Sequence, residues 1–297
     1  LIDQLFAEQI PLRYPRGCLA LISLLFGPNL SSKMTALRLF SRTLGSPRKT
    51  KVLVAHGLAG SGRNWLTVGE AISQAGFCVE LLDLRDHGQS PKSDALNYAE
   101  LVNDVAEHLR QQGNPPTIFL GHSMGGKLGM ALVAREKNLF IEGLCVVDSA
   151  PRGYQIAYAP ALDACHNLDL TQIKTRAEAD AQLAPKISDA QFRQFLLSNL
   201  GRDDAGGFRW VCNWATITRD VQQIGENPVK PGDRWDGPVL EIAGSQSEYF
   251  IPGEDEARMR EHFPKLQVEW LPTGHNVHIE APQQFVEIFT RWAQALQ

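Results

Sequence analysis

The sequence predicts an α/β protein, built as a mostly parallel, doubly wound sheet with a helical cap inserted into it. From Lys51 onward, short β-rich runs alternate with segments of helical periodicity, which is the pattern of βαβ units. The alternation stops over residues 151–236, which read as helices, and then resumes. We therefore assign residues 34–150 and 237–297 to one α/β core and residues 151–236 to the cap.

The individual elements follow from periodicity and from start and stop signals. The clearest helix begins after Asn97, which can cap it; Glu100 occupies the capping-box position, and Gly113 marks the end. Residues 35–43 alternate apolar and polar side chains, which suits an additional first strand. The remaining predictions are strands at 52–55, 77–84, 117–121, 144–148, 239–244 and 267–271, and helices near 64–75, 124–136, 254–262 and 282–296.

Charge and cysteine content exclude several classes of function. Of the 29 basic and 33 acidic residues, seven basic and two acidic lie within residues 1–49, so the remainder carries nine more acids than bases. Such a surface does not favour nucleic acid or an anionic membrane as a partner. The five cysteines are scattered without metal-ligand spacing, which indicates reduced thiols in an intracellular compartment. They are Cys18, Cys78, Cys145, Cys165 and Cys212.

Residues 1–33 are predicted to be a leader or extension outside the folded core. The apolar run "CLALISLLF" (18–26) is too short to span a bilayer, so we expect no stable membrane span. The stretch is basic and poor in acids, as transit peptides are, and the first methionine is Met34. We expect a soluble intracellular protein, either cytoplasmic or, if this stretch is a transit peptide, mitochondrial.

A glycine-rich loop follows the first buried strand, in "VLVAHGLAGSGRNW" (53–66). Four residues separate Gly57 from Gly62, as in a phosphate-binding P-loop. Such a loop then requires Lys and Ser or Thr, but Arg63 and Asn64 stand at those positions. The loop therefore has another purpose.

A candidate nucleophile lies between the strand at 117–121 and the next helix. "GHSMG" is a G-x-S-x-G motif centred on Ser123. A serine on a tight strand-to-helix turn is held in a strained geometry that exposes its hydroxyl, and the helix start favours developing negative charge. The alternative is a glycine-rich turn with an incidental serine.

A serine hydroxyl needs a base, and His275 follows the last predicted strand in "PTGHNVH". Two alternatives are a structural histidine and a metal pair formed with His278. No third residue with zinc-like spacing accompanies them, so we predict neither a metal nor a cofactor. We expect His278 to support the loop or to begin the final helix.

The carboxylate that would orient His275 is less obvious. A G-x-x-D pattern after the strand at 239–244 is the usual source, but here Ser247 stands in the acid's place. Asp148 ends the preceding strand at the same sheet edge, so we predict Asp148 as the acid and Ser247 as an auxiliary hydrogen-bonding group. The alternative for Asp148 is a turn-capping role before Pro151. The reserve candidates are Glu248, Asp255 and Asp220.

The candidate nucleophile suggests a function for the glycine-rich loop in residues 53–66. It follows a strand that neighbours the nucleophile, where acyl-transfer chemistry needs a backbone N–H group. We predict that the amides of Leu58 and Met124 form an oxyanion hole, and that the glycines let the loop approach closely.

These motifs together resemble those of the α/β-hydrolases, and more narrowly of the abhydrolase-domain-eleven-type esterases and their bacterial short-chain esterase relatives. Members of that group often use an acid after the sixth strand, which agrees with Asp148. Turn chemistry accounts for Asp83, Arg85 and His87 as residues that fix a loop and are not catalytic. Lys127, in the helix after Ser123, contacts the cap or a substrate, or is solvated. The motifs, between residues 52 and 285, are "HGLAGSGRNW", "DLRDHGQSP", "LGHSMGGK", "VVDSAP", "QFLLSNL" with its following "FRW", and "GHNVHIEAP".

We therefore expect a cofactor-independent serine hydrolase that cleaves small carboxylic esters or thioesters. The alternatives are a perhydrolase or a carbon–carbon bond hydrolase on the same triad, or a non-catalytic ligand-binding homologue. A dehalogenase is disfavoured because its nucleophile would be Asp where Ser123 stands. Aromatic residues of the cap either roof an apolar acyl pocket or pack the cap's own core. They are Phe192, Phe195, Phe208, Trp210 and Trp214.

Overall fold

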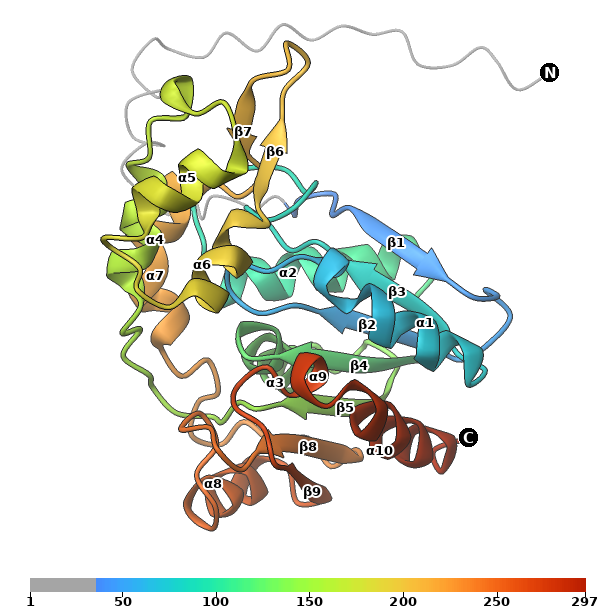
Figure 1. Ribbon diagram of the computed structural model, residues 1–297. Coiled ribbons are helices and arrows are strands. Elements are labelled where there is room, and N and C mark those ends of the chain that lie inside the picture. The colour runs from blue at the N-terminus through green and yellow to red at the C-terminus, as the bar shows by residue number, and fades with distance from the viewer. Residues whose placement is uncertain (1–35) are drawn as a thin grey trace, which may run out of the picture. The chain divides into compact units, whose positions relative to one another are not determined.

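A seven-stranded sheet forms the centre of the protein, with the strand order β1-β3-β2-β4-β5-β8-β9 (Figure 1). A computed structural model describes residues 36–297, so the predicted extension 1–33 lies outside the described residues. β1 pairs antiparallel with β3, and the other neighbours are parallel, which confirms the predicted fold class. The strands are β1 (Ser41–Leu44), β2 (Lys51–Ala55), β3 (Cys78–Leu82), β4 (Thr117–His122), β5 (Ile141–Val147), β8 (Val239–Gly244) and β9 (Leu266–Leu271).

Helices cover both faces of this sheet. Apolar residues of α1 and α10 pack on one face, and those of α2 and α3 pack on the other. The predicted cap of α2 is present, because the Asn97 side chain accepts a hydrogen bond from the Glu100 amide at 3.0 Å. The core helices are α1 (Leu66–Gln74, after the 3-10 turn Gly62–Trp65), α2 (Tyr98–Gln111), α3 (Met124–Arg135), α8 (Glu254–His262), α9 (Val277–Glu280) and α10 (Pro282–Gln294).

The segment between β5 and β8 gathers at one edge of the sheet (Figure 1). Its Asn199 side chain donates to the Ala59 carbonyl at 2.8 Å, so the cap contacts the loop that follows β2. A two-stranded hairpin interrupts its helices, which the sequence analysis did not anticipate. The cap elements are α4 (Ala159–His166), α5 (Arg176–Leu183), α6 (Ala190–Leu197), β6 (Leu200–Arg202), β7 (Phe208–Trp210) and α7 (Trp214–Gly225), with a 3-10 turn at Leu170–Gln172.

Lys127 links the cap to helix α3. Its Nζ donates to the carbonyl oxygens of Gly225, at 3.0 Å, and Glu226, at 2.8 Å, where α7 ends. The same ammonium lies 3.9 Å from the centroid of the Tyr154 ring. Burial lowers the pKa of Lys127 to about 7. Of the roles that the sequence left open for this lysine, the structure favours contact with the cap.

Two buried histidines hold the loop between β2 and α1. His56 donates from Nδ1 to the Gly57 carbonyl at 2.8 Å, and its Nε2 accepts from the Leu84 amide at 3.0 Å. His87 likewise donates to a backbone carbonyl, and its Nε2 accepts from the Ala59 amide at 3.1 Å. Both rings must be neutral to accept at Nε2. Burial accordingly lowers the pKa of each to about 4.

We expect Lys127→Met to lower the free energy of unfolding by about 1–3 kcal/mol, because two carbonyl groups lose their donor. Urea unfolding measures this change. Lys137→Met is the matched control: its ammonium also donates to two backbone carbonyls, those of Val133 and Arg234, but is exposed. We expect the control to change stability by less than about 0.5 kcal/mol. Equal effects in the two variants would contradict a special contribution of the buried Lys127 contact.

We also expect the free energy of unfolding to fall as the pH is lowered from about 6.5 to about 4. In this range His56 and His87 are protonated in the unfolded chain but stay neutral in the folded protein. Urea unfolding at several pH values across this window measures the slope. His87→Gln keeps an acceptor but cannot take up a proton, so its slope should be shallower. A slope equal to that of the parent would show that His87 does not cause the acid sensitivity.

Candidate active site

Ser123 occupies a strained turn between β4 and α3. Its backbone has φ 53° and ψ −114°, a conformation that non-glycine residues rarely adopt. Only glycine fits on either side: an added Cβ at Gly121 would lie 2.1 Å from the Gly125 carbonyl oxygen, and one at Gly125 would lie 2.2 Å from that of Ala55. The G-x-S-x-G pattern thus forms the sharp turn that the sequence analysis predicted.

Asp148 and His275 form a close pair, although 127 positions separate them in the sequence. His275 Nδ1 lies 2.6 Å from Asp148 Oδ2, and the carboxylate is fully buried. The same oxygen accepts from the Ser247 hydroxyl at 2.5 Å, while Oδ1 accepts from the Gly244 amide at 3.0 Å. Both predicted partners of His275 therefore lie on one network, with the carboxylate in contact with the imidazole and the serine behind it.

The reserve carboxylates lie elsewhere. Asp255 and Asp220 each pair with an arginine, at 3.0 and 2.7 Å. Neither of them, nor Glu248, lines the cavity that contains Ser123. Among the described residues, Asp148 is the carboxylate that contacts His275.

The loop after β2 lies against the nucleophile turn. A Cβ added at Gly57 would be 3.3 Å from Ser123 Cβ, so the absence of a side chain permits the close approach. Leu58 follows in this loop and lines the cavity. Met124 begins α3, where the first backbone N–H groups have no partner within the helix. The two amides predicted for the oxyanion hole therefore belong to segments that flank Ser123.

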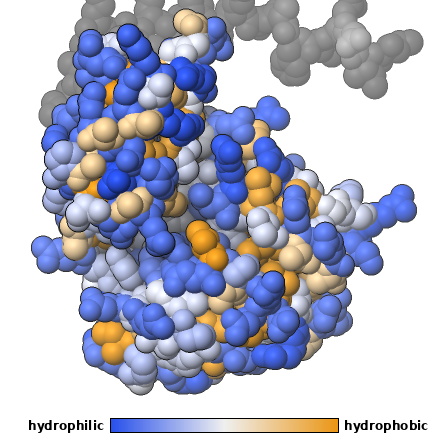
Figure 2. All heavy atoms as spheres, in the orientation of Figure 1, coloured by the Kyte–Doolittle hydropathy of each residue, from blue (hydrophilic) through white to orange (hydrophobic). Residues whose placement is uncertain are grey.

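Ser123 and His275 open onto one cavity of about 610 Å³. Figure 2 shows the surface hollowed between the cap and the core. The apolar part of its lining includes Trp65, Tyr158, Phe192, Phe195, Tyr249 and Ile279. Polar groups also line it, namely Asn64, Asp189, Gln191, Asn276 and Glu280.

The cap aromatic residues divide between the two predicted roles. Phe192 and Phe195 line the cavity, as the roof hypothesis requires. Trp210 and Trp214 instead contact each other edge to face, 5.6 Å between centroids, and pack with Phe208 in the hydrophobic core. Of the two alternatives, packing in the hydrophobic core therefore applies to these three residues.

Two residues that contact His275, Tyr249 and His122, were not predicted from the sequence. The Tyr249 ring stacks on the imidazole at 4.0 Å, and His122 Nε2 donates to the His275 carbonyl at 3.0 Å. His122 stands inside the G-x-S-x-G motif, so its position offered a signal, whereas Tyr249 offered none. His278 stacks on Trp65 at 3.9 Å, and burial lowers its pKa to about 3, in keeping with the predicted supporting role.

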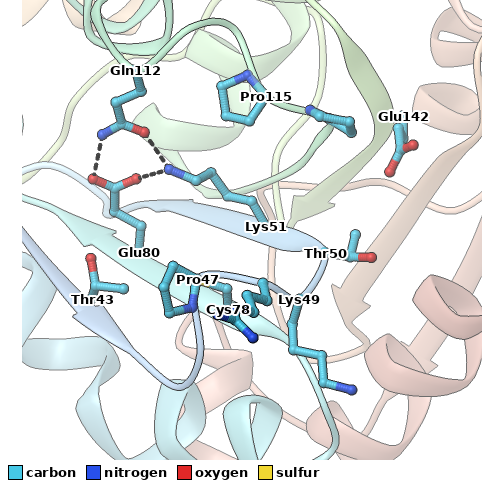
Figure 3. Close-up of a pocket in the computed structure, with 12 residues that line it drawn as sticks. Thr43, Pro47, Lys49, Thr50, Lys51, Cys78, Glu80, Gln112, Pro115 and Glu142 are labelled. Atoms are coloured by element: carbon cyan, nitrogen blue, oxygen red, sulfur yellow. Dashed lines mark hydrogen bonds and ion pairs between the residues drawn. The ribbon is translucent and has the colours of Figure 1, made fainter.

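A second cavity, of about 660 Å³, lies where β2 and β3 begin (Figure 3). It is at the opposite end of the parallel strands from Ser123, which follows β4. Lys51 pairs with Glu80 at 2.6 Å, and Gln112 donates to the same carboxylate at 2.9 Å. Burial raises the pKa of the Cys78 thiol in its wall. Lys51, Glu80 and Gln112 satisfy one another and Cys78 is buried, so the first cavity is the candidate site.

Residues 36–297 contain neither a cluster of metal-ligating side chains nor a helix suited to cross a membrane. No three His, Cys, Asp or Glu side chains in this range come together as a set that could hold a metal ion. None of its helices combines the length and apolarity needed to cross a bilayer. Its four cysteines are buried and free of disulfides.

Comparison with known proteins places the chain in a family. Residues 51–282 match the family described as the alpha/beta hydrolase fold. The mouse sn-1-specific diacylglycerol lipase ABHD11 is 33% identical over 249 residues, covering 80% of this chain and 79% of its own length. Esterase YbfF of Escherichia coli is 27% identical over 243 residues, covering 81% and 92%.

Solved structures agree with this placement. A marine microorganism esterase has a TM-score of 0.82 and 30% identity, and the match covers 86% of this chain and all of that one. The chain belongs to the α/β-hydrolase family and resembles the ABHD11-type esterases.

Proposed function

We propose that this chain hydrolyses carboxylic esters or thioesters through an acyl-enzyme on Ser123, without a cofactor. The observation that carries the proposal is the Asp148–His275 pair at 2.6 Å, whose imidazole opens onto the same cavity as Ser123. The relatives, a lipase and esterases by name, support an ester substrate.

In this mechanism the Nδ1–H group of His275 donates a hydrogen bond to the Asp148 carboxylate, which stays ionised, and this leaves Nε2 to accept the proton of Ser123. The described hydrogen bonds do not join Ser123 to His275 directly; such bonds tighten when a substrate binds. The serine oxygen attacks the acyl carbon, and the leaving alcohol or thiol takes the proton from Nε2. Water, deprotonated by the same nitrogen, then releases the carboxylic acid and restores the Ser123 hydroxyl.

The amides of Leu58 and Met124 would bind the oxyanion of each tetrahedral intermediate. One such donor is typically worth about 10²–10³ in rate. Ser247 acts more weakly, because its hydroxyl donates to Asp148 but cannot balance the charge of an imidazolium ion. In this proposal the polar residues of the cavity wall contact the alcohol or thiol part of the substrate, and Phe192 and Phe195 contact an apolar acyl chain.

We expect Ser123→Ala to abolish hydrolysis of p-nitrophenyl esters while the fold persists. Asp148→Asn should lower turnover by about 10⁴, because the imidazole loses the group that fixes its tautomer and balances its charge. Ser247→Ala should lose far less, since Asp148 keeps its bonds to His275 and the Gly244 amide. Steady-state kinetics on variants checked by circular dichroism measure these losses.

Near-normal turnover by Asp148→Asn would overturn the choice of acid but not the serine mechanism. Fluorophosphonate labelling tests the latter, because only an activated serine reacts. Failure of the parent protein to label would favour a non-catalytic homologue. Labelling without ester turnover would favour a perhydrolase or a carbon–carbon bond hydrolase.

The division of the cap aromatics gives another prediction. We expect Phe195→Ala to change the preference for acyl-chain length, because this ring lines the cavity, with a smaller effect on stability. Trp210→Ala should leave the preference unchanged and lower the melting temperature, because this ring packs in the hydrophobic core. A p-nitrophenyl ester series and thermal unfolding measure both. The reverse pattern would contradict our placement of the acyl chain.

A further inference from the structure

A buried carboxyl group lies beside the candidate acid and has no role in the mechanism above. Glu241 stands in the middle of β8 and is 0% exposed. Its Oε1 accepts a hydrogen bond from the Ser149 amide at 3.3 Å, while Oε2 has no hydrogen-bond partner among the described residues. A buried carboxyl group that is only half satisfied costs stability, so its presence here calls for a reason.

Of two neighbouring buried acids, Glu241 has the fewer hydrogen-bond donors. Asp148 receives three donors, from His275, Ser247 and the Gly244 amide, whereas Glu241 receives one. Two adjacent buried carboxyls do not both ionise, and the charge belongs where the donors are. Burial and then the charge of Asp148 hold the pKa of Glu241 well above its usual range.

Glu241 contacts the turn that aims Asp148 at His275. The strand register places Glu241 beside Val146, and its side chain reaches forward to the Ser149 amide. Asp148 has φ 52°, in the left-handed region that strains a non-glycine residue. The Asp148 amide donates to the Ile242 carbonyl at 3.1 Å. Two successive amides of the strained turn are therefore bound from β8, one by a carbonyl and one by the Glu241 side chain.

We propose that Glu241 is a positioning residue, whose carboxyl group binds the 148–149 turn and so holds the Asp148 carboxylate in line with His275. This inference rests on the function proposed above. Glu241 touches neither the substrate cavity nor His275, so its effect on the reaction passes through Asp148.

Two substitutions separate the acceptor from the bulk of the side chain. Glu241→Gln keeps a carbonyl acceptor for the Ser149 amide and is as neutral as the protonated acid, so it should keep most of the parental kcat. Glu241→Leu fills a similar volume without an acceptor. It should lower kcat roughly 10- to 100-fold, with KM little changed, because a catalytic group moves but the cavity does not.

Val239→Ala is the matched control. Val239 is fully buried on the same face of β8, two residues from Glu241, and its truncation weakens the core without removing an acceptor from the turn. It should lower the melting temperature and leave kcat unchanged. Glu241→Leu should also lose its effect when Asp148→Asn is already present, since the group that it positions is then disabled.

Equal kcat values in Glu241→Leu and Val239→Ala would overturn the inference. So would equal losses in Glu241→Gln and Glu241→Leu, or a full additional loss in the Asp148→Asn background. Assaying Ser123→Ala in parallel distinguishes failure of the proposed function from failure of the positioning role. If Ser123→Ala retains turnover, the proposed function fails. If Ser123→Ala is inactive and Glu241→Leu is not impaired, only the positioning role fails.

Discussion

A single buried carboxylate, that of Asp148, connects the segments on which the candidate site depends. Removing an ionised carboxyl from water costs several kcal/mol unless hydrogen bonds replace the lost hydration. Here the donors come from the end of β8, from the loop after it and from the loop after β9, through Gly244, Ser247 and His275. Since the charge is satisfied only when all three segments are in place, it ties the sheet edge to the imidazole.

The parallel sheet makes this arrangement possible. β4, β5 and β8 run parallel and adjacent, so their carboxyl ends meet at one edge. Ser123 and Asp148 leave that edge with φ values of 53° and 52°, strains of about 1–3 kcal/mol each that persist only in surroundings that impose them. Backbone bonds on the neighbouring strands supply the restraint: the Ser123 amide donates to Val147 and the Asp148 amide to Ile242. The ends of rigid strands thus hold Ser123 and Asp148, and the loops after β8 and β9 hold Ser247 and His275.

The cap contributes to the same region through few but buried contacts. Lys127, one helical turn beyond Ser123, binds the end of α7, and Asn199 binds the loop that contains Leu58. Neutral histidines complete this loop, because a protonated ring could not accept the backbone amides at Nε2. The two histidines therefore add no buried charge to the loop beside the nucleophile.

The sequence alone determined the order of strands and helices, the nucleophile turn and the histidine after the last strand, because periodicity, helix caps and glycine spacing act over a few residues. It also limited the candidates for the carboxylate that orients His275 to Asp148 and three reserve residues. Only the tertiary structure decided which carboxylate meets the imidazole, which aromatic rings line the cavity and where Lys127 points. The same holds for Tyr249 and Glu241 and for the hairpin within the cap. These outcomes depend on contacts between segments far apart in the chain, such as the 127 positions between Asp148 and His275, and no local pattern encodes such a distance.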